Sequence, residues 1–363
     1  MSFNFSVAAP ADGSSFSNLT ALQAVMKEYY GPQEIKRLAY KKNRWLAMLH
    51  KEEDWAGLVV PIPTIYANPQ GASAAFATAL NNQNSSAAVR FIMNWAQDYA
   101  VVTVTNLLAL ASRSDSGAFL KAVQTEMNGG IKTAQNRLGG GLFRRSTGSI
   151  GTGQLATGVI TLVDVNTVTQ FEVGQVLVQS ATDGGAAAGS GGPTDGPDTG
   201  GTNGYVIAVD RMAGTVTVSA TRGGAAGNPS GWSTAAAQFY RTRGDVNLKV
   251  NGLADWLPTS APGGADSFNN VNRSVDPSRL AGIRWNGSAQ VIAEALIDAA
   301  AVAAREEGTP ELCITNFQTF AALEKDLGSK VNYVNYEHDE IPGIGFTGIR
   351  IHGADEEINV FAD

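Results

Sequence analysis

The stretch that decides the fold runs from Ser114 to Arg145 and reads SDSGAFLKAVQTEMNGGIKTAQNRLGGGLFRR. Its apolar residues recur at steps of three and four, which predicts one long amphipathic helix. The apolar stripe consists of Phe119, Val123, Met127, Ile131, Ala134, Leu138 and Leu142. Ser114 or Asp115 can cap the start of this helix. Because glycine costs about 1 kcal/mol in a helix interior, Gly129-Gly130 predicts a bend or a close backbone contact there.

The segment before this helix is almost free of charge, with two charged residues between positions 55 and 112. Residues 57–66 read GLVVPIPTIY, a strand whose prolines cannot donate to a ladder, so we expect an edge strand or an isolated ribbon. Residues 68–88 are small and polar and predict a loop tip, and residues 89–105 return as a second strand. A two-stranded arm of this kind is only marginally stable by itself in water. It therefore lies either on a partner molecule or back on its own domain.

The segment that follows, residues 146–245, has the composition of a small β domain. Its short β runs are residues 159–163, 171–178, 205–209 and 215–218. Asp210–Gly214 forms a hairpin turn between the last two. Ala181–Gly204 is a Gly/Ala/Pro/Asp loop that lacks the residues to build a core. The segment predicts a small barrel or sandwich inserted into the main domain, with a mobile loop.

The last third of the chain predicts a mixture of helices and strands. We expect Ser288 to cap a helix with Val291, Ile292, Ala295, Leu296 and Ala299 facing inward, and Asn316 to cap a second helix. Short strands are expected at residues 312–314, 349–351 and 358–361. The single cysteine, Cys313, predicts a buried small apolar residue rather than a reactive thiol. The whole chain is thus expected to belong to the α+β class.

Charge is distributed unevenly along the sequence. Residues 27–51 hold seven bases and two acids, a net of +5, and residues 290–363 hold fourteen acids and four bases, a net of −10. A helix in the first segment is basic on one face, through Lys36, Arg37, Lys41, Lys42 and Arg44. This face can bind nucleic acid phosphates or an acidic protein neighbour. The opposite charges suit head-to-tail contact between copies of the chain, or they are two unrelated solvated faces.

Motifs for chemistry are weak throughout. Residues 343–348 match the letters of a dinucleotide-binding fingerprint, but a proline precedes them and a β run follows, where that motif needs a strand and then a helix. Residues 338–340 (HDE) are better explained as a solvated acidic loop than as a metal site, and Asp195 with Asp198 resembles a calcium loop only loosely. The sequence shows no catalytic triad, phosphate loop or zinc spacing. It therefore predicts no enzyme, no metal and no cofactor, and it has no apolar run that could cross a bilayer.

The order of the expected elements is distinctive: an arm, a basic helix, an uncharged hairpin, a long helix and a domain that ends in helix, strand and helix. This order resembles the major capsid protein of tailed double-stranded DNA bacteriophages, whose fold was first described in phage HK97. Two runs carry the resemblance in detail. Glu311–Phe320 (ELCITNFQTF) is similar to a strand of that family followed by a helix that starts at Asn, and Phe346–Gly353 (FTGIRIHG) is similar to its late axial strands.

The resemblance implies a division of the whole chain. Residues 1–52 would be the N-terminal arm, 53–113 the extended hairpin called the E-loop, 114–145 the spine helix of the peripheral domain, 146–245 an inserted all-β domain, and 246–363 the axial domain with the remaining peripheral strands. It also implies self-assembly into pentamers and hexamers of an icosahedral virion head, built in the host bacterial cytoplasm. Packaged double-stranded DNA, bound without sequence specificity, and portal, separate scaffold and decoration proteins would be partners, with no membrane.

Subunit contacts are expected from the basic helix and from aromatic residues of the hairpin. The candidates are Lys36, Arg37, Lys41, Lys42, Arg44, Tyr66, Phe76, Phe91 and Trp95. Three departures from the family pattern stand out. No lysine lies between Lys51 and Lys121, so the crosslinking through an E-loop lysine that some members use is not expected. No scaffold segment precedes the arm, and the chain stops at Asp363 where relatives continue, as a truncated sequence would.

Two other functions compete with a phage capsid. A bacterial encapsulin, which stores an enzyme cargo, would share the fold, but the glycine-rich insert and the long arm favour the phage protein. A β-rich adhesin or carbohydrate-binding module would account for residues 150–245 and leave the long helix and the hairpin unexplained.

Overall fold

The structure is a computed structural model. It describes residues 45, 48–49, 57, 59–103, 116–192, 198–264, 266–327, 349–352 and 357–362, with side chains in the long helix from Met127 onward. Helices and strands are both present. The chain divides into two compact units, one containing residues 96–252 and the other containing residues 48–95 and 253–363. Each unit is described by itself below.

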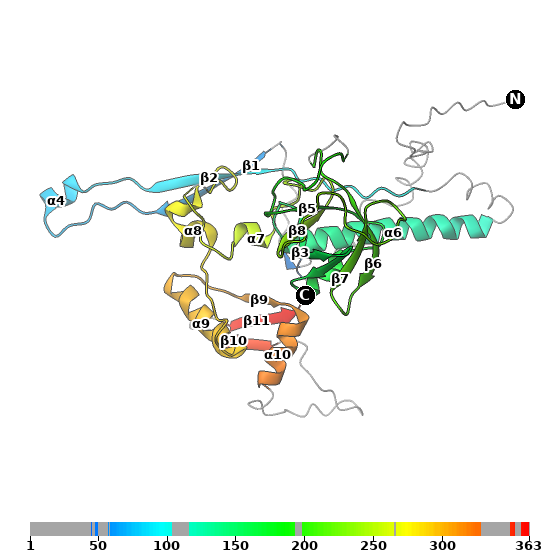
Figure 1. Ribbon diagram of the computed structural model, residues 1–363. Helices are drawn as coiled ribbons and strands as arrows, with labels where there is room; N and C mark the ends of the chain where they lie inside the picture. The colour runs from blue at the N-terminus through cyan, green and yellow to red at the C-terminus, as the bar shows by residue number, and fades with distance from the viewer. Residues whose placement is uncertain are drawn as a thin grey trace. The chain divides into compact units, whose positions relative to one another are not determined.

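The long helix of the first unit is α6, Ser116–Phe143, and it confirms the predicted helix over most of its length (Figure 1). Its expected caps, Ser114 and Asp115, lie outside the described residues. A side chain at Gly130 would collide with Val102, whereas Gly129 has open space around it. Of the two alternatives for the glycine pair, the close contact is therefore confirmed, at Gly130.

The inserted segment is a closed six-stranded antiparallel barrel, which confirms a barrel over a sandwich. Its elements are β3 (Ser149–Ala156), β4 (Val159–Leu162), the 3-10 helix η1 (Val165–Gln170), β5 (Val176–Ser180), β6 (Gly204–Asp210), β7 (Thr215–Ser219) and β8 (Gln238–Thr242). The strand order is β3-β4-β7-β6-β5-β8, and β8 pairs with β3 to close the barrel. Its core includes Leu155, Ile160, Phe171, Leu177, Val216, Trp232 and Tyr240.

Three details of this barrel differ from the expectation. The predicted strand at 171–178 begins only at Val176, because a turn closed by a 3.2 Å hydrogen bond from the Gln175 N–H to the Glu172 carbonyl oxygen follows Phe171. Neither β3 nor β8 was predicted. In β3 a side chain at Gly151 would lie 3.0 Å from the ring of Phe171, so the strand needs glycine in order to pack against this buried ring.

The loop Ala181–Gly204 also corrects the sequence interpretation. In its described parts, residues 181–192 and 198–204, the loop packs on the barrel. Asp198 is buried, and the backbone of Ala188 hydrogen-bonds Gln179 and Thr202. The loop therefore contributes a buried charged residue to the unit, although its composition predicted no core at all.

The second unit contains a two-stranded ribbon of β1 (Val59–Ala67) and β2 (Ala87–Asn94). Of the two alternatives that the prolines left, an edge strand or an isolated ribbon, the pair confirms the isolated ribbon. The second strand stops at Asn94, earlier than the predicted Thr105. The tip, predicted as a loop, carries a short helix, α4 (Phe76–Asn81), seen at the end of the ribbon in Figure 1.

The rest of this unit follows the predicted alternation. Its elements are α7 (Leu253–Trp256), the 3-10 helix η2 (Arg273–Val275), α8 (Pro277–Ala281), α9 (Ile292–Arg305), β9 (Leu312–Thr315), α10 (Phe317–Leu327), β10 (Ile349–His352) and β11 (Glu357–Ala362). The sheet order is β10-β11-β9, with β9 and β11 parallel. Asn316 caps α10 as predicted, by accepting a 2.7 Å hydrogen bond from the Thr319 N–H. Ser288 does not cap α9, which begins at Ile292 after an uncapped Val291.

Candidate functional site

The ribbon has one covered and one open face. Residues that are directly opposite in an antiparallel pair share a face, and the register pairs Pro61 with Ile92 and Pro63 with Arg90. The open face, called here the outer arm face, consists of Val59, Pro61, Pro63, Ile65, Ala88, Arg90, Ile92 and Asn94. All of these except the half-buried Ile92 are exposed, and Ile65 is 68% exposed. Arg90 is the one charged residue on this mostly apolar surface.

The other face of the ribbon packs on the second unit. Phe91 is 5% exposed and joins Val271 and Leu280 in a core cluster, with its ring 5.6 Å from that of Trp256. Tyr66 is half-buried against the same cluster, and its carbonyl oxygen accepts a 2.7 Å hydrogen bond from Arg279. The expectation of a subunit contact through Phe91 therefore needs correction, because its ring is occupied within the chain. The ribbon has folded back on its own unit through this face and left the outer arm face uncovered.

Two other predicted contact residues are exposed. Phe76 is 82% exposed at the start of α4, and Leu80, one helical turn later, is also exposed. Trp95 is 61% exposed while its indole N–H donates a 2.9 Å hydrogen bond to the Gly57 carbonyl oxygen, which fixes the ring at the base of the ribbon. The structure thus presents both rings to solvent at opposite ends of the arm. The five basic residues of the predicted contact set, Lys36, Arg37, Lys41, Lys42 and Arg44, lie outside the described residues.

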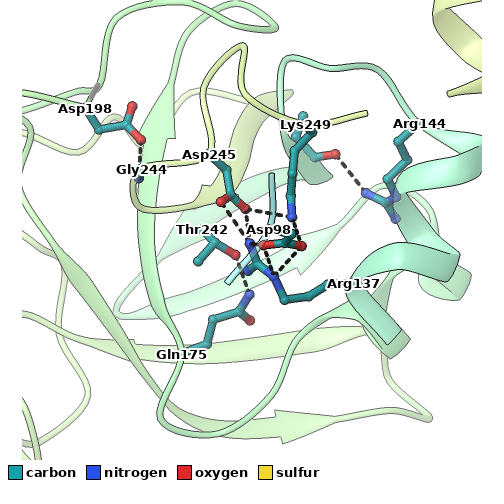
Figure 2. A network of polar contacts seen from close by, with 10 residues as sticks. Asp98, Arg137, Arg144, Gln175, Asp198, Thr242, Gly244, Asp245 and Lys249 are labelled. Carbon is teal, nitrogen blue, oxygen red and sulfur yellow. Dashed lines mark hydrogen bonds and ion pairs between the residues drawn. The ribbon is translucent and has the colours of Figure 1, made fainter. Parts of the chain in front are cut away.

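The first unit holds a network of ion pairs that sequence reasoning did not find (Figure 2). Arg137 of α6 lies 2.8 Å from Asp98, in the segment before the helix, and 2.9 Å from Asp245, directly after β8. Lys249 lies 2.6 Å from the second Asp98 oxygen and 3.7 Å from Asp245. Two acids and two bases therefore bind the segment 96–103, the long helix and the exit of the barrel to one another.

The surroundings shift the pKa values of these groups in opposite directions. Burial alone would raise the pKa of Asp98, but hydrogen bonds and charge from Arg137 and Lys249 outweigh it and leave this pKa below its ordinary value. Burial raises the pKa of Asp245 despite the same two cations. Desolvation lowers the pKa of the nearby Arg144 to about 10, and this guanidinium donates a 3.0 Å hydrogen bond to the Ser149 carbonyl oxygen. The network holds these structural elements together, and its Arg137 also lines the cavity described below.

A more deeply buried ion pair lies inside the barrel unit. The guanidinium of Arg241 is 2.6 Å from Asp198, and both side chains are at most 2% exposed. Arg241 also donates to the Ser180 hydroxyl and to the Gly185 carbonyl oxygen, each at 2.8 Å. The second Asp198 oxygen accepts a 2.7 Å hydrogen bond from the Gly244 N–H, which Figure 2 shows. This pair fastens the long loop to β8, and Asp198 is fully engaged with the protein itself rather than poised as a calcium ligand.

A polar cavity of about 490 Å³ lies in the first unit between α6 and the residues after η1. Lys132, Thr133 and Asn136 line it from the helix, and Gln170 and Gln175 from the barrel. Its one lining carboxylate, Glu172, is paired with Arg211 at 2.8 Å. The lining is made of amides, two threonine hydroxyls and the charged side chains of Lys132, Arg137 and Glu172.

The other sequence candidates for chemistry have these outcomes. Within the described ranges, no three His, Cys, Asp or Glu side chains lie close enough to bind a metal ion. Asp195, residues 338–340 and residues 343–348 are outside those ranges. Cys313 is half-buried, and burial raises the pKa of its thiol, in agreement with the predicted packing role. No helix in the described part of the chain is long and apolar enough to span a membrane.

Comparison of the chain with protein families, with curated proteins and with solved structures finds no match.

Proposed function

We propose that this chain is a shell protein, the major capsid protein of a tailed double-stranded DNA bacteriophage. It would assemble with copies of itself into pentamers and hexamers that enclose DNA without reading its sequence. One observation carries the proposal: the ribbon of β1 and β2 is an arm with no acid and one base, folded on its own unit through one face only. A long apolar surface of this kind is typical of a protein that is buried by its neighbours.

Other features of the structure support the same assignment. The sequence order of uncharged hairpin, long helix, inserted barrel and helix–strand–helix ending is present in the described elements. The barrel starts within ten residues of the end of α6, where the proposed fold would have an insertion after the long helix. Among the residues that the structure places, the ion-pair networks join structural elements to one another. A scaffold whose polar groups are engaged in packing and whose arm is uncovered is suited to assembly rather than to turnover.

Electron microscopy of the purified full chain tests the proposal. We expect closed shells of uniform size. Deletion of residues 68–88 with a short turn in their place should leave soluble, folded subunits that no longer close into shells, because the tip of the arm with Phe76 and Leu80 is lost. Circular dichroism of the deletion variant is the control for folding. Soluble monomers from the wild-type chain at high concentration, or normal shells from the deletion variant, would contradict the proposal.

A further inference from the structure

The hydrogen-bonding pattern of the ribbon shows which way the backbone of β1 faces. The N–H of Ile92 donates a 3.0 Å hydrogen bond to Asn269, so it points away from β1. Ile92 is directly opposite Pro61. Because the two residues of a non-hydrogen-bonded pair both direct their backbone groups outward, the nitrogen of Pro61 lies on the free edge of β1. The same holds for Pro63, two residues further along the strand.

This placement removes hydrogen-bond donors from the edge of β1. A free strand edge normally offers alternating N–H and C=O groups to an incoming strand. At Pro61 and Pro63 the edge keeps the carbonyl oxygens and has no N–H, since proline carries none. Strand addition at the centre of β1 would leave backbone carbonyls of the incoming strand without donors, which is unfavourable in a buried interface. The edge of β1 is therefore closed to strand addition, while the outer arm face beside it stays open.

The composition of the outer arm face indicates what it can bind. Val59, Ile65 and Ile92 supply apolar surface, and Arg90 places one cation among them. Within the described part of the chain no ion pair joins Arg90 to an acid. An apolar surface around one unpaired guanidinium fits a partner that is apolar and presents a carboxylate.

We propose that the outer arm face docks flat against a second copy of this chain, with Arg90 paired to a carboxylate of that copy, and that Pro61 and Pro63 prevent the arm from joining its neighbour edge to edge. Charge complementarity is the reason for choosing a second copy of the chain as the partner that binds the outer arm face. The chain from residue 290 to 311 has five acids and one base, and Glu294, Glu307 and Glu311 are exposed there, whereas the arm has no acid. This inference rests on the proposed self-assembly and specifies its contact.

Single substitutions in the full chain test whether the outer arm face forms the contact between copies. Ile65→Asp places a charge on the apolar surface and should lower the assembled fraction about tenfold or more, since burial of one large aliphatic side chain is worth at least a factor of ten. Val163→Asp is the matched control, because Val163 is a 73% exposed β-branched residue on the barrel, and it should assemble normally. Arg90→Glu should block assembly, and Arg90→Lys should retain most of it. Sedimentation velocity and electron microscopy measure the assembled fraction, and circular dichroism checks folding.

The double variant Pro61→Val/Pro63→Val tests the edge. It restores two outward N–H groups without changing the hydrophobic character of the face, so we expect irregular sheet-like aggregates that bind a cross-β dye, in competition with regular assembly. Regular shells at wild-type yield without dye binding would overturn the role of the prolines. Normal assembly by both Ile65→Asp and Arg90→Glu would overturn the face-on contact while leaving shell formation intact. A wild-type chain that forms no assembly would instead overturn the proposed function.

Discussion

The ion pair between Arg241 and Asp198 gives the sharpest test of how the barrel is held together. Both side chains are almost fully buried, and the closest distance between them is 2.6 Å. Among the described residues, Asp198 is the one acid bonded to the guanidinium, so Asp198→Ala leaves Arg241 with the Ser180 hydroxyl and the Gly185 carbonyl oxygen. It also frees the Gly244 N–H. Removing one partner from a buried pair costs about 3–5 kcal/mol, because an uncompensated charge stays buried.

The matched control is an exposed pair in the same barrel. Arg211 and Glu172 are 2.8 Å apart, but their side chains are 47% and 61% exposed. Glu172→Ala should cost less than about 1 kcal/mol, because solvent already screens this pair. The two substitutions thus remove similar contacts at different burial. The difference between the two losses of unfolding free energy measures the effect of desolvation rather than the presence of an ion pair.

Hydrogen exchange in increasing urea, read by mass spectrometry on peptides from β8, isolates the barrel from the second unit. With an urea dependence of about 2 kcal/mol per molar, the midpoint for Asp198→Ala should fall by roughly 1.5–2.5 M. The double variant Asp198→Ala/Arg241→Met should recover part of this loss, since it removes both charges. A loss below about 1 kcal/mol for Asp198→Ala, or a double variant less stable than the sum of both singles, would refute the reasoning.

Two further predictions concern the barrel and the second unit. Burial raises the pKa of Tyr240 to about 12, so the unfolded chain loses its phenol proton first as pH rises above 10. The barrel should lose about 2 kcal/mol between pH 10 and pH 12, and Tyr240→Phe should abolish this alkaline loss in unfolding curves. Phe91→Ala should destabilise the second unit by about 3–5 kcal/mol, whereas Phe76→Ala should change its melting point little, because only Phe91 is buried. Equal effects of the two would contradict the packing assignment.

Features that depend on neighbouring residues were predictable from the sequence. The three-and-four spacing of apolar residues identified α6, and Asn316 identified the start of α10. Two prolines in β1 indicated an edge strand or an isolated ribbon, because a missing N–H limits where a strand can lie whatever surrounds it, and the structure has the ribbon. The same local information showed that the arm has a single charged residue, Arg90. In each case the physical cause acts over a few residues, so a short stretch of sequence is enough to predict the feature.

Features that depend on distant residues required the tertiary structure. Asp198 lies in a loop of small residues, and its partner Arg241 is 43 positions away, so composition alone indicated a loop without a core. Strand β3 is rich in glycine and was missed, because its packing against Phe171 becomes visible only when the barrel closes. From the sequence, the ribbon could lie either on a partner molecule or on its own domain. Only the packing of Phe91 on Trp256, more than 160 positions away, showed which face the chain itself covers and which face it leaves for another molecule.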